Sequence, residues 1–178
     1  SLYYAPYSYR SDNDIKTIFL GDTTYRYFNL DWYLLPKLLK KPLWTEPYYD
    51  TGGGDILMTT FCAPFYRHRN GERVFAGVVT ADISIDWIQN LFNDIKIYDT
   101  GYAVLLSKNG SFIYHPSKEL ILNETIFSLA ESIDDKELWQ IGRDVKDGKA
   151  GFISRESYNN HQDSFLYYTP IPVGDWSL

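Results

Sequence analysis

The sequence predicts an α+β protein in which antiparallel strands with flanking helices occur in two successive units. One observation is a pair of long strand-like segments, residues 56–66 and 73–83, joined at Asn70-Gly71. Both residues of an Asn-Gly pair accept the positive φ angles that a type I′ hairpin turn requires. The other observation is that a second hairpin signal, Asn109-Gly110, opens a further series of helices and strands. Hairpins followed by helices indicate antiparallel sheets with helices to one side.

We expect the first unit over residues 1–95. Its predicted elements are strands at residues 2–9, 17–20, 56–66 and 73–83, a short helix that ends near Lys40, and a second helix that begins after Ser84. Leucines four residues apart indicate the first helix, and Pro42 ends it. Pro36 is expected in its first turn, where a missing amide costs little. Ser84 is a good N-cap for the second helix.

We expect the second unit over residues 96–178. Its predicted elements are strands at residues 102–107, 111–115, 151–155, 164–169 and 175–178, with two helices between the second and third strands. Asn123 or Thr125 can cap the first of these helices. Asp134-Asp135 open the second, and Gly148 ends it. The turn at Asn109-Gly110 is expected to be of the same type as the turn at Asn70-Gly71.

The return strand of the first hairpin suggests where a ligand could bind. Because side chains alternate along a strand, Ala76, Val78, Thr80 and Asp82 share one face. That face is small and ends in a carboxylate. It suits the floor of a cavity better than a packed core.

Composition excludes several classes of function. Seventeen basic against 23 acidic residues give a net charge of −6, which opposes nucleic-acid binding. The lone Cys62 cannot form an intramolecular disulfide or a cysteine-rich zinc site, and a buried, inert thiol is expected there. His68, His115 and His161 share no metal-ligand spacing, and no nucleophile elbow is present. We therefore expect no enzyme, no metal and no cofactor.

No apolar run approaches the roughly 20 residues that span a bilayer, and no signal peptide precedes the chain. The first and last residues are strand-like, so we expect a fragment of a longer protein. Aromatic residues make up 17% of the chain, with 16 tyrosines. Tyrosine offers an apolar face and a polar tip, which suit the lining of a binding site.

Four segments carry a resemblance to a known family: WTEPYYDTGGGDILMTTFCAPFYR, GERVFAGVVTADISIDWIQ, IYDTGYAVLLSKNGSFIYHP and YYTPIPVGDWSL. They resemble the extracytoplasmic double-Cache sensor domains of prokaryotic receptors, over nearly the whole chain. The resemblance implies two PAS-like units, a membrane-distal one that binds the ligand and a membrane-proximal one, beside a long N-terminal helix. That helix and the first distal strand are expected outside this sequence, with the membrane spans and a cytoplasmic histidine kinase, serine phosphatase or chemotaxis transducer. The full-length receptor is expected to be membrane-embedded and homodimeric, with this domain periplasmic or extracellular.

The resemblance also implies a set of ligand-binding residues. Relatives that sense amino acids carry a tyrosine, then Arg-x-Trp-Tyr, then Tyr-x-Asp, then an aspartate at the end of a strand. The matching residues here are Tyr25, Trp32, Tyr33, Tyr48, Asp50 and Asp82. Leu30 stands where the arginine that grips the ligand's carboxylate is expected. The half of the pattern that holds an ammonium group is intact.

A site of two carboxylates with aromatic walls suits a small organic cation, an amine or an amino-acid-like molecule. Other interpretations remain for each residue. Trp32 and Tyr33 could be core anchors, Asp50 could be a turn residue, and Asp82 could cap the helix after Ser84. The glycines at residues 52–54 lack the features of a phosphate loop and form a flexible turn or a lid. The alternative function is a ligand-free structural or dimerisation spacer of such a receptor.

Overall fold

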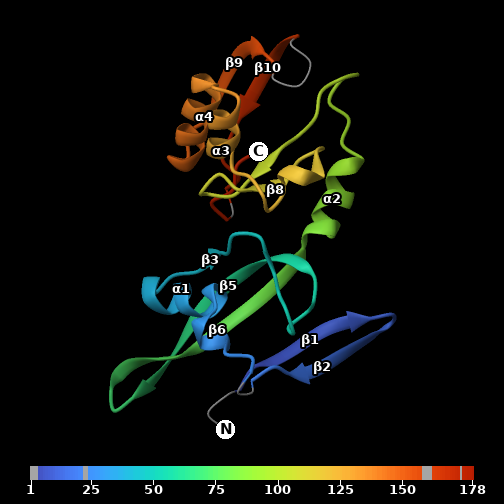
Figure 1. The fold of residues 1–178 in the computed structure, drawn as a ribbon. Coiled ribbons are helices and arrows are strands. Elements are labelled where there is room, and N and C mark those ends of the chain that lie inside the picture. The colour runs from blue at the N-terminus through green and yellow to red at the C-terminus, as the bar shows by residue number, and fades with distance from the viewer. Residues whose placement is uncertain (1–3, 22–23, 158–161, 173) are drawn as a thin grey trace. The chain divides into compact units, whose positions relative to one another are not determined.

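The computed structural model describes residues 4–21, 24–157, 162–172 and 174–178. Contacts between residues divide the chain into two compact units, Ser1–Ser84 and Ile85–Leu178 (Figure 1). By these contacts, the helix after Ser84 groups with the second unit. Within the described residues, no helix is both long enough and apolar enough to cross a membrane.

The first unit is built on one long antiparallel hairpin. Its elements are β1 (Pro6–Ser11), β2 (Asp14–Phe19), η1 (Tyr27–Asn29), α1 (Asp31–Leu39), β3 (Leu43–Trp44), β4 (Tyr48–Tyr49), β5 (Leu57–Arg69) and β6 (Glu72–Ser84). Strand β5 is central, because β6 pairs along one edge while β3 and β4 pair along the other. Strands β1 and β2 form a separate hairpin. Of the strand expected at residues 2–9, Leu2 and Tyr3 lie outside the described residues.

The turn between β5 and β6 has the predicted geometry. Asn70 has φ 53° and Gly71 has φ 81°, so both central residues adopt the left-handed conformation of a type I′ turn. The ladder then runs from Arg69 paired with Glu72 to Met58 paired with Ser84. The register of this ladder fixes which side chains of the two strands share a face.

Helix α1 lies against β5 and β6, but its start differs from the prediction. It begins at Asp31, so Pro36 lies inside the helix and not in its first turn. The proline has no amide to donate, and its buried ring contributes to packing instead. The helix ends at Lys40, whose left-handed backbone (φ 56°) lets its amide donate to the carbonyl of Pro36 at 2.9 Å. Trp32 and Tyr33 lie in the first turn of α1, and the ring of Tyr33 packs on Phe75 of β6.

The second unit places four helical segments among two small antiparallel sheets. Its elements are α2 (Ile85–Asn93), β7 (Leu105–Leu106), β8 (Phe112–Tyr114), η2 (Lys118–Leu120), α3 (Ile126–Ser132), α4 (Lys136–Lys146), β9 (Gly151–Glu156) and β10 (Asp163–Tyr168). Thr125 caps α3 in a capping box with Ser128, and Asp135 caps α4. Buried apolar side chains from α3, α4 and β8 form its core, among them Ile113, Ile126 and Ile141.

Two predictions for the second unit are wrong in detail. Asn109 does not have a positive φ, and only Gly110 is left-handed, at φ 87°. The amide of Gly110 donates to the carbonyl of Ser107 at 3.0 Å, so the turn is a three-residue loop that ends in a left-handed glycine. The strand expected at residues 175–178 is reduced to isolated bridges, in which Ser177 pairs with Leu106 and Pro170. Strands β9 and β10 pair with each other and do not extend the β7–β8 sheet.

Candidate ligand-binding site

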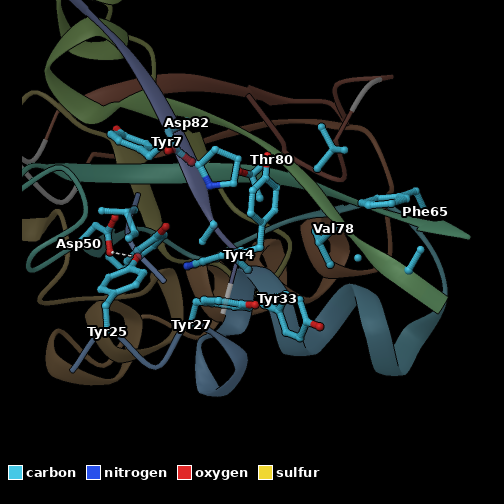
Figure 2. A pocket seen from close by; sticks show the side chains of 18 residues that line it. Tyr4, Tyr7, Tyr25, Tyr27, Tyr33, Asp50, Phe65, Val78, Thr80 and Asp82 are labelled. Atoms are coloured by element: carbon cyan, nitrogen blue, oxygen red, sulfur yellow. Dashed lines mark hydrogen bonds between the residues drawn. The ribbon is translucent and has the colours of Figure 1, made fainter. Parts of the chain in front are cut away.

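The first unit contains a cavity of about 450 Å³. Its wall comes from the start of β1, the η1–α1 segment, the end of β4 and the strand β6 (Figure 2). All six residues expected at the site line this cavity: Tyr25, Trp32, Tyr33, Tyr48, Asp50 and Asp82. The fold therefore brings together residues that span about a third of the chain.

Asp50 ends β4 and is only 5% exposed. The hydroxyl of Tyr25 donates a hydrogen bond of 2.9 Å to its Oδ1 atom. Its backbone carbonyl accepts from the amides of Gly53, Gly54 and Asp55 at 3.2, 3.2 and 2.9 Å. The backbone of Asp50 thus forms the turn, while its side chain lines the cavity. The two interpretations from sequence apply to different atoms of the same residue.

Asp82 lies near the end of β6, directly opposite Thr60 on β5. The hydroxyl of Thr60 donates to Oδ1 of Asp82 at 2.8 Å, and the hydroxyls of Tyr48 and Thr60 are 2.8 Å apart. Because Thr60 has a single hydroxyl proton and gives it to Asp82, Tyr48 must donate to Thr60. The Asp82 side chain therefore lies at the cavity wall, where it accepts from Thr60.

Burial shifts the acidity of both carboxyl groups in the same direction. Desolvation raises the pKa of Asp82, against a lowering by the Thr60 hydrogen bond. Desolvation also raises the pKa of Asp50, the Tyr25 hydrogen bond lowers it, and the negative charge of Asp82 raises it further. The described residues that line the cavity include no lysine, arginine or histidine. The cavity is therefore anionic without an internal counter-charge, a state that a bound cation would relieve.

Aromatic rings form the wall opposite the carboxylates. Tyr27 stacks on Trp32 with ring centroids 5.7 Å apart, and it meets Tyr33 edge to face at 5.1 Å. Tyr27 lies only two residues after Tyr25 and also lines the cavity, although it is not part of the predicted site. Trp32 and Tyr33 thus pack on an aromatic neighbour and face the cavity as well. Aromatic faces attract cations by about 0.5 to 2 kcal/mol each.

Tyr7 of β1 was also missed. Its pKa is raised by burial and then by the charges of Asp82 and Asp50, so its hydroxyl lies near both carboxylates. Figure 2 shows Tyr7 beside Asp82. No spacing in the sequence links β1 to these aspartates, because the proximity arises only from the tertiary fold. In the sequence, the only indication that Tyr7 could line a binding site is that it is a tyrosine.

Ala76, Val78, Thr80 and Asp82 all line the cavity as expected, but Gly77 and Val79 line it too. The β5–β6 ladder shifts register between Phe65 and Tyr66 and leaves Ala76 without a cross-strand partner in the ladder, so the alternation of side chains is interrupted there. Cys62, which pairs with Thr80 across the ladder, is fully buried, and its thiol donates to the carbonyl of Leu43 at 3.3 Å. Burial, followed by the charge of Asp82, raises the pKa of this thiol to about 12, so it is inert as expected. Leu30 precedes α1 with an extended backbone and does not line the cavity.

An antiparallel sheet backed by a helix, with an anionic aromatic cavity between them, defines a small-molecule-binding domain. The model of the family described as "Methyl-accepting chemotaxis protein-like, first PDC sensor domain" matches residues 1–90, half of the sequence. The chain belongs to this family of PDC sensor domains. The family is one of sensors and not of enzymes, which agrees with the expectation from sequence.

Known proteins similar to this chain include chemotaxis proteins and the extracellular domain of a putative histidine kinase. The chain is 31% identical over 91 residues to the methyl-accepting chemotaxis protein PscA of Pseudomonas syringae pv. tomato, a match that covers 51% of this chain and 14% of that receptor. The extracellular domain of the putative histidine kinase mmHK1S-Z3 superposes with a TM-score of 0.77 and 25% identity, covering 97% of this chain and 58% of that one.

A second similar structure is the ligand-binding domain of the Pseudomonas aeruginosa amino acid chemoreceptor PctB in complex with L-Gln. It matches with a TM-score of 0.61 and 23% identity, and the match covers 97% of this chain and 64% of that one. At this identity the similarity shows the fold alone. The three matches agree on a PDC-type sensor fold.

Proposed function

We propose that this chain is the extracytoplasmic ligand-binding sensor domain of a membrane-bound signalling receptor. In this proposal a small organic cation, an amine or an amino-acid-like molecule, binds in the cavity of the first unit. The observation that carries the proposal is a pair of carboxylates, the buried Asp50 and the half-buried Asp82, in one aromatic cavity whose described lining has no cationic side chain. The similarity to extracellular domains of chemoreceptors and histidine kinases supports the location.

The expected affinity follows from the chemistry of the cavity. A charged hydrogen bond contributes roughly 1.5 to 3 kcal/mol, and each aromatic face adds about 0.5 to 2 kcal/mol. A ligand of roughly seven to ten heavy atoms, at about 1 kcal/mol per atom at most, binds with a dissociation constant near micromolar. That range suits a receptor that responds to changing concentrations of a nutrient or signal.

The wider receptor belongs to the same proposal. We assign residues 1–95 to a membrane-distal Cache unit and residues 96–178 to a membrane-proximal one, together forming a double-Cache domain. Superposition of 97% of the chain on the histidine kinase domain supports this assignment. The full receptor is then embedded in a membrane, is homodimeric and carries a histidine kinase, a serine phosphatase or a chemotaxis transducer. A ligand-free spacer would fill the cavity with its own side chains, so a volume of about 450 Å³ favours the sensor.

Signalling would follow from a population shift at the glycine turn. The amide of Gly52 donates to Oδ1 of Asp55 at 2.8 Å, and three amides of the turn converge on the carbonyl of Asp50. A cation that engages the carboxylate of Asp50 would favour one arrangement of this turn. A ligand can shift the receptor only by its difference in affinity for the two conformations.

The test is a thermal-shift screen of the chain against amines, amino acids and short carboxylates. A ligand at a hundredfold excess over its dissociation constant stabilises the fold by about 2.7 kcal/mol, which raises the melting temperature measurably. We expect stabilisation by ligands that carry an ammonium group and none by carboxylates without one. If only carboxylates raise the melting temperature, the proposed ligand class is wrong.

A further inference from the structure

The cavity is polarised along β6. Asp82 and Thr80 line one part of it, while Val78 and Ala76 line it further along the strand. A strand rises about 3.3 Å per residue, so about 13 Å of strand separate Asp82 from Val78. The floor therefore changes from carboxylate to hydroxyl to hydrocarbon over the length of a small molecule.

The side chains around the floor follow the same gradient. Asp50, with its partner Tyr25, lies on the Asp82 side of Figure 2, and Phe65 lies beyond Val78 on the other side. The ladder agrees with the view, because Thr60 pairs with Asp82 while Phe65 pairs with Gly77. Both carboxylates are thus at one end of the cavity. The other end offers aromatic and aliphatic surface, and Phe65 is 47% exposed there.

We propose that the ligand is a monoamine with an aromatic or hydrocarbon tail and without a carboxylate, its ammonium held by Asp50 and Asp82 and its tail lying along Val78 toward Phe65. This inference rests on the proposed function and specifies its ligand class. An ammonium at the acidic end replaces the water that burial removed from the carboxylates. The tail at the apolar end is released from water.

Two other ligand classes fit less well. A linear diamine would place its second ammonium beside Val78 and Phe65, where no described carboxylate pairs with it. A charge taken out of water without a partner is strongly unfavourable. An amino acid would bring a carboxylate near Asp50 and Asp82, with no cationic side chain in the described lining to bind it. Each class therefore has one charged group without a partner.

The experiment is calorimetric titration of the chain with four probes: phenethylamine, ethylamine, octanediamine and phenylalanine. We expect phenethylamine to bind about tenfold to a hundredfold more tightly than ethylamine, because its ring is buried at the apolar end. Phenylalanine differs from phenethylamine only by its carboxylate and should bind at least tenfold more weakly. Tighter binding of octanediamine or phenylalanine than of phenethylamine would overturn the inference.

A matched pair of variants locates the tail. Val78→Asp places a carboxylate at the apolar end, so it should weaken phenethylamine and strengthen octanediamine, each by about tenfold or more. Val74→Asp is the same substitution on the same strand, outside the cavity lining, and should change neither affinity by more than about twofold. Equal effects of the two variants would contradict the placement of the tail. The four probes on the parent chain decide the ligand class even if Val78→Asp does not fold.

The outcomes separate this inference from the proposed function. If amines bind with equal affinity whatever their tail, the placement of the tail is contradicted, while the proposed amine sensor stands. If none of the amines binds, the placement of the tail and the proposed amine sensor are both contradicted. Binding of phenylalanine alone would support an amino-acid sensor and contradict the monoamine.

Discussion

Thr60 and Asp82 are directly opposite each other on β5 and β6, and the hydroxyl of Thr60 donates to the Asp82 carboxylate at 2.8 Å. Tyr48 in turn donates to Thr60, so one buried hydroxyl connects an aromatic wall to a cavity carboxylate. Thr60 is only 1% exposed, which leaves water no access to replace it. The orientation of Asp82 therefore depends on a residue outside the cavity lining.

This relationship predicts the behaviour of Thr60→Val, which keeps the side-chain shape and removes the hydroxyl. Tyr48 and Asp82 each lose a buried hydrogen-bond partner, so the free energy of unfolding should fall by about 1 to 3 kcal/mol. Amine affinity should fall about tenfold, because Asp82 is no longer held in place. Urea unfolding and calorimetric titration measure the two effects.

Thr59→Val is the matched control. Thr59 is also fully buried, but it lies on the other face of β5 and donates to the carbonyl of Thr45 at 2.9 Å. Its replacement should lower stability by a similar amount and leave amine affinity unchanged. If both variants reduce affinity equally, Thr60 acts through stability and does not position Asp82.

The raised pKa of Asp82 predicts how stability depends on pH. A carboxyl group with a raised pKa binds its proton more tightly in the folded chain than in the unfolded chain. Its contribution to the free energy of unfolding therefore falls as pH rises from its ordinary value of 3.8 through the raised value. Asp82→Asn removes this charge. The variant should be more stable than the parent near neutral pH and should lose that advantage as the pH falls through the raised pKa of Asp82 toward 3.8.

Urea unfolding at a series of pH values checks this prediction, with Asp163→Asn on exposed β10 as the control. Amine affinity should change in the opposite direction. The ammonium needs ionised carboxylates, so affinity should weaken as pH falls through the raised pKa values of Asp50 and Asp82. Amine affinity that stays constant over that range would mean that these groups do not contact the ligand.

The glycine turn predicts an effect of Gly53→Ala. A Cβ atom at Gly53 would lie 1.8 Å from Oδ2 of Asp50, so the carboxylate must move. We expect amine affinity to fall about tenfold or more. Gly148→Ala is the control: its φ of 69° strains the new residue by about 1 to 2 kcal/mol, and no atom lies within 4 Å of the added carbon. That variant should lose stability and keep its affinity, as calorimetry would show.

In the second unit, Asp135 is expected to stabilise the fold through two contacts. It caps α4 by accepting from the amide of Leu138 at 2.8 Å, and it pairs with Arg155, whose side chain is only 9% exposed. Asp135→Ala should lower the free energy of unfolding by about 3 kcal/mol, because α4 loses its cap and the buried guanidinium of Arg155 loses its nearest carboxylate, with Glu137 left 3.8 Å away. Asp147→Ala removes an exposed ion pair with Lys149 and should change stability by less than about 1 kcal/mol. If urea unfolding shows that the two variants lose similar amounts of stability, the role assigned to Asp135 is contradicted.

The β5–β6 hairpin could be predicted because its signals are local. The turn follows from Asn70-Gly71, and the presence of Val78, Thr80 and Asp82 at the cavity follows from alternation along one strand. The second hairpin shows the limit of the same rule. There the turn involves Lys108 and Asn109, with Gly110 as the left-handed residue, so an Asn-Gly pair alone does not define a type I′ turn.

The remaining parts of the site depend on contacts distant in sequence. Tyr7 reaches the carboxylates from the first strand, and Thr60 reaches Asp82 through the register of the ladder. Neither of these contacts could be predicted from the spacing of the residues along the chain. The division after Ser84 could not be read from sequence either, because the strand and the following helix are continuous while their contacts belong to different units.

The most direct test of the central claim is calorimetric titration of phenethylamine into the parent chain and into the double variant Asp50→Asn/Asp82→Asn. Asparagine keeps the shape of each side chain and removes both negative charges, and it also relieves their desolvation in the folded state. The account predicts a dissociation constant near micromolar for the parent and no measurable binding for a folded double variant. A double variant that binds phenethylamine as tightly as the parent would show that the two cavity carboxylates do not recognise the ligand.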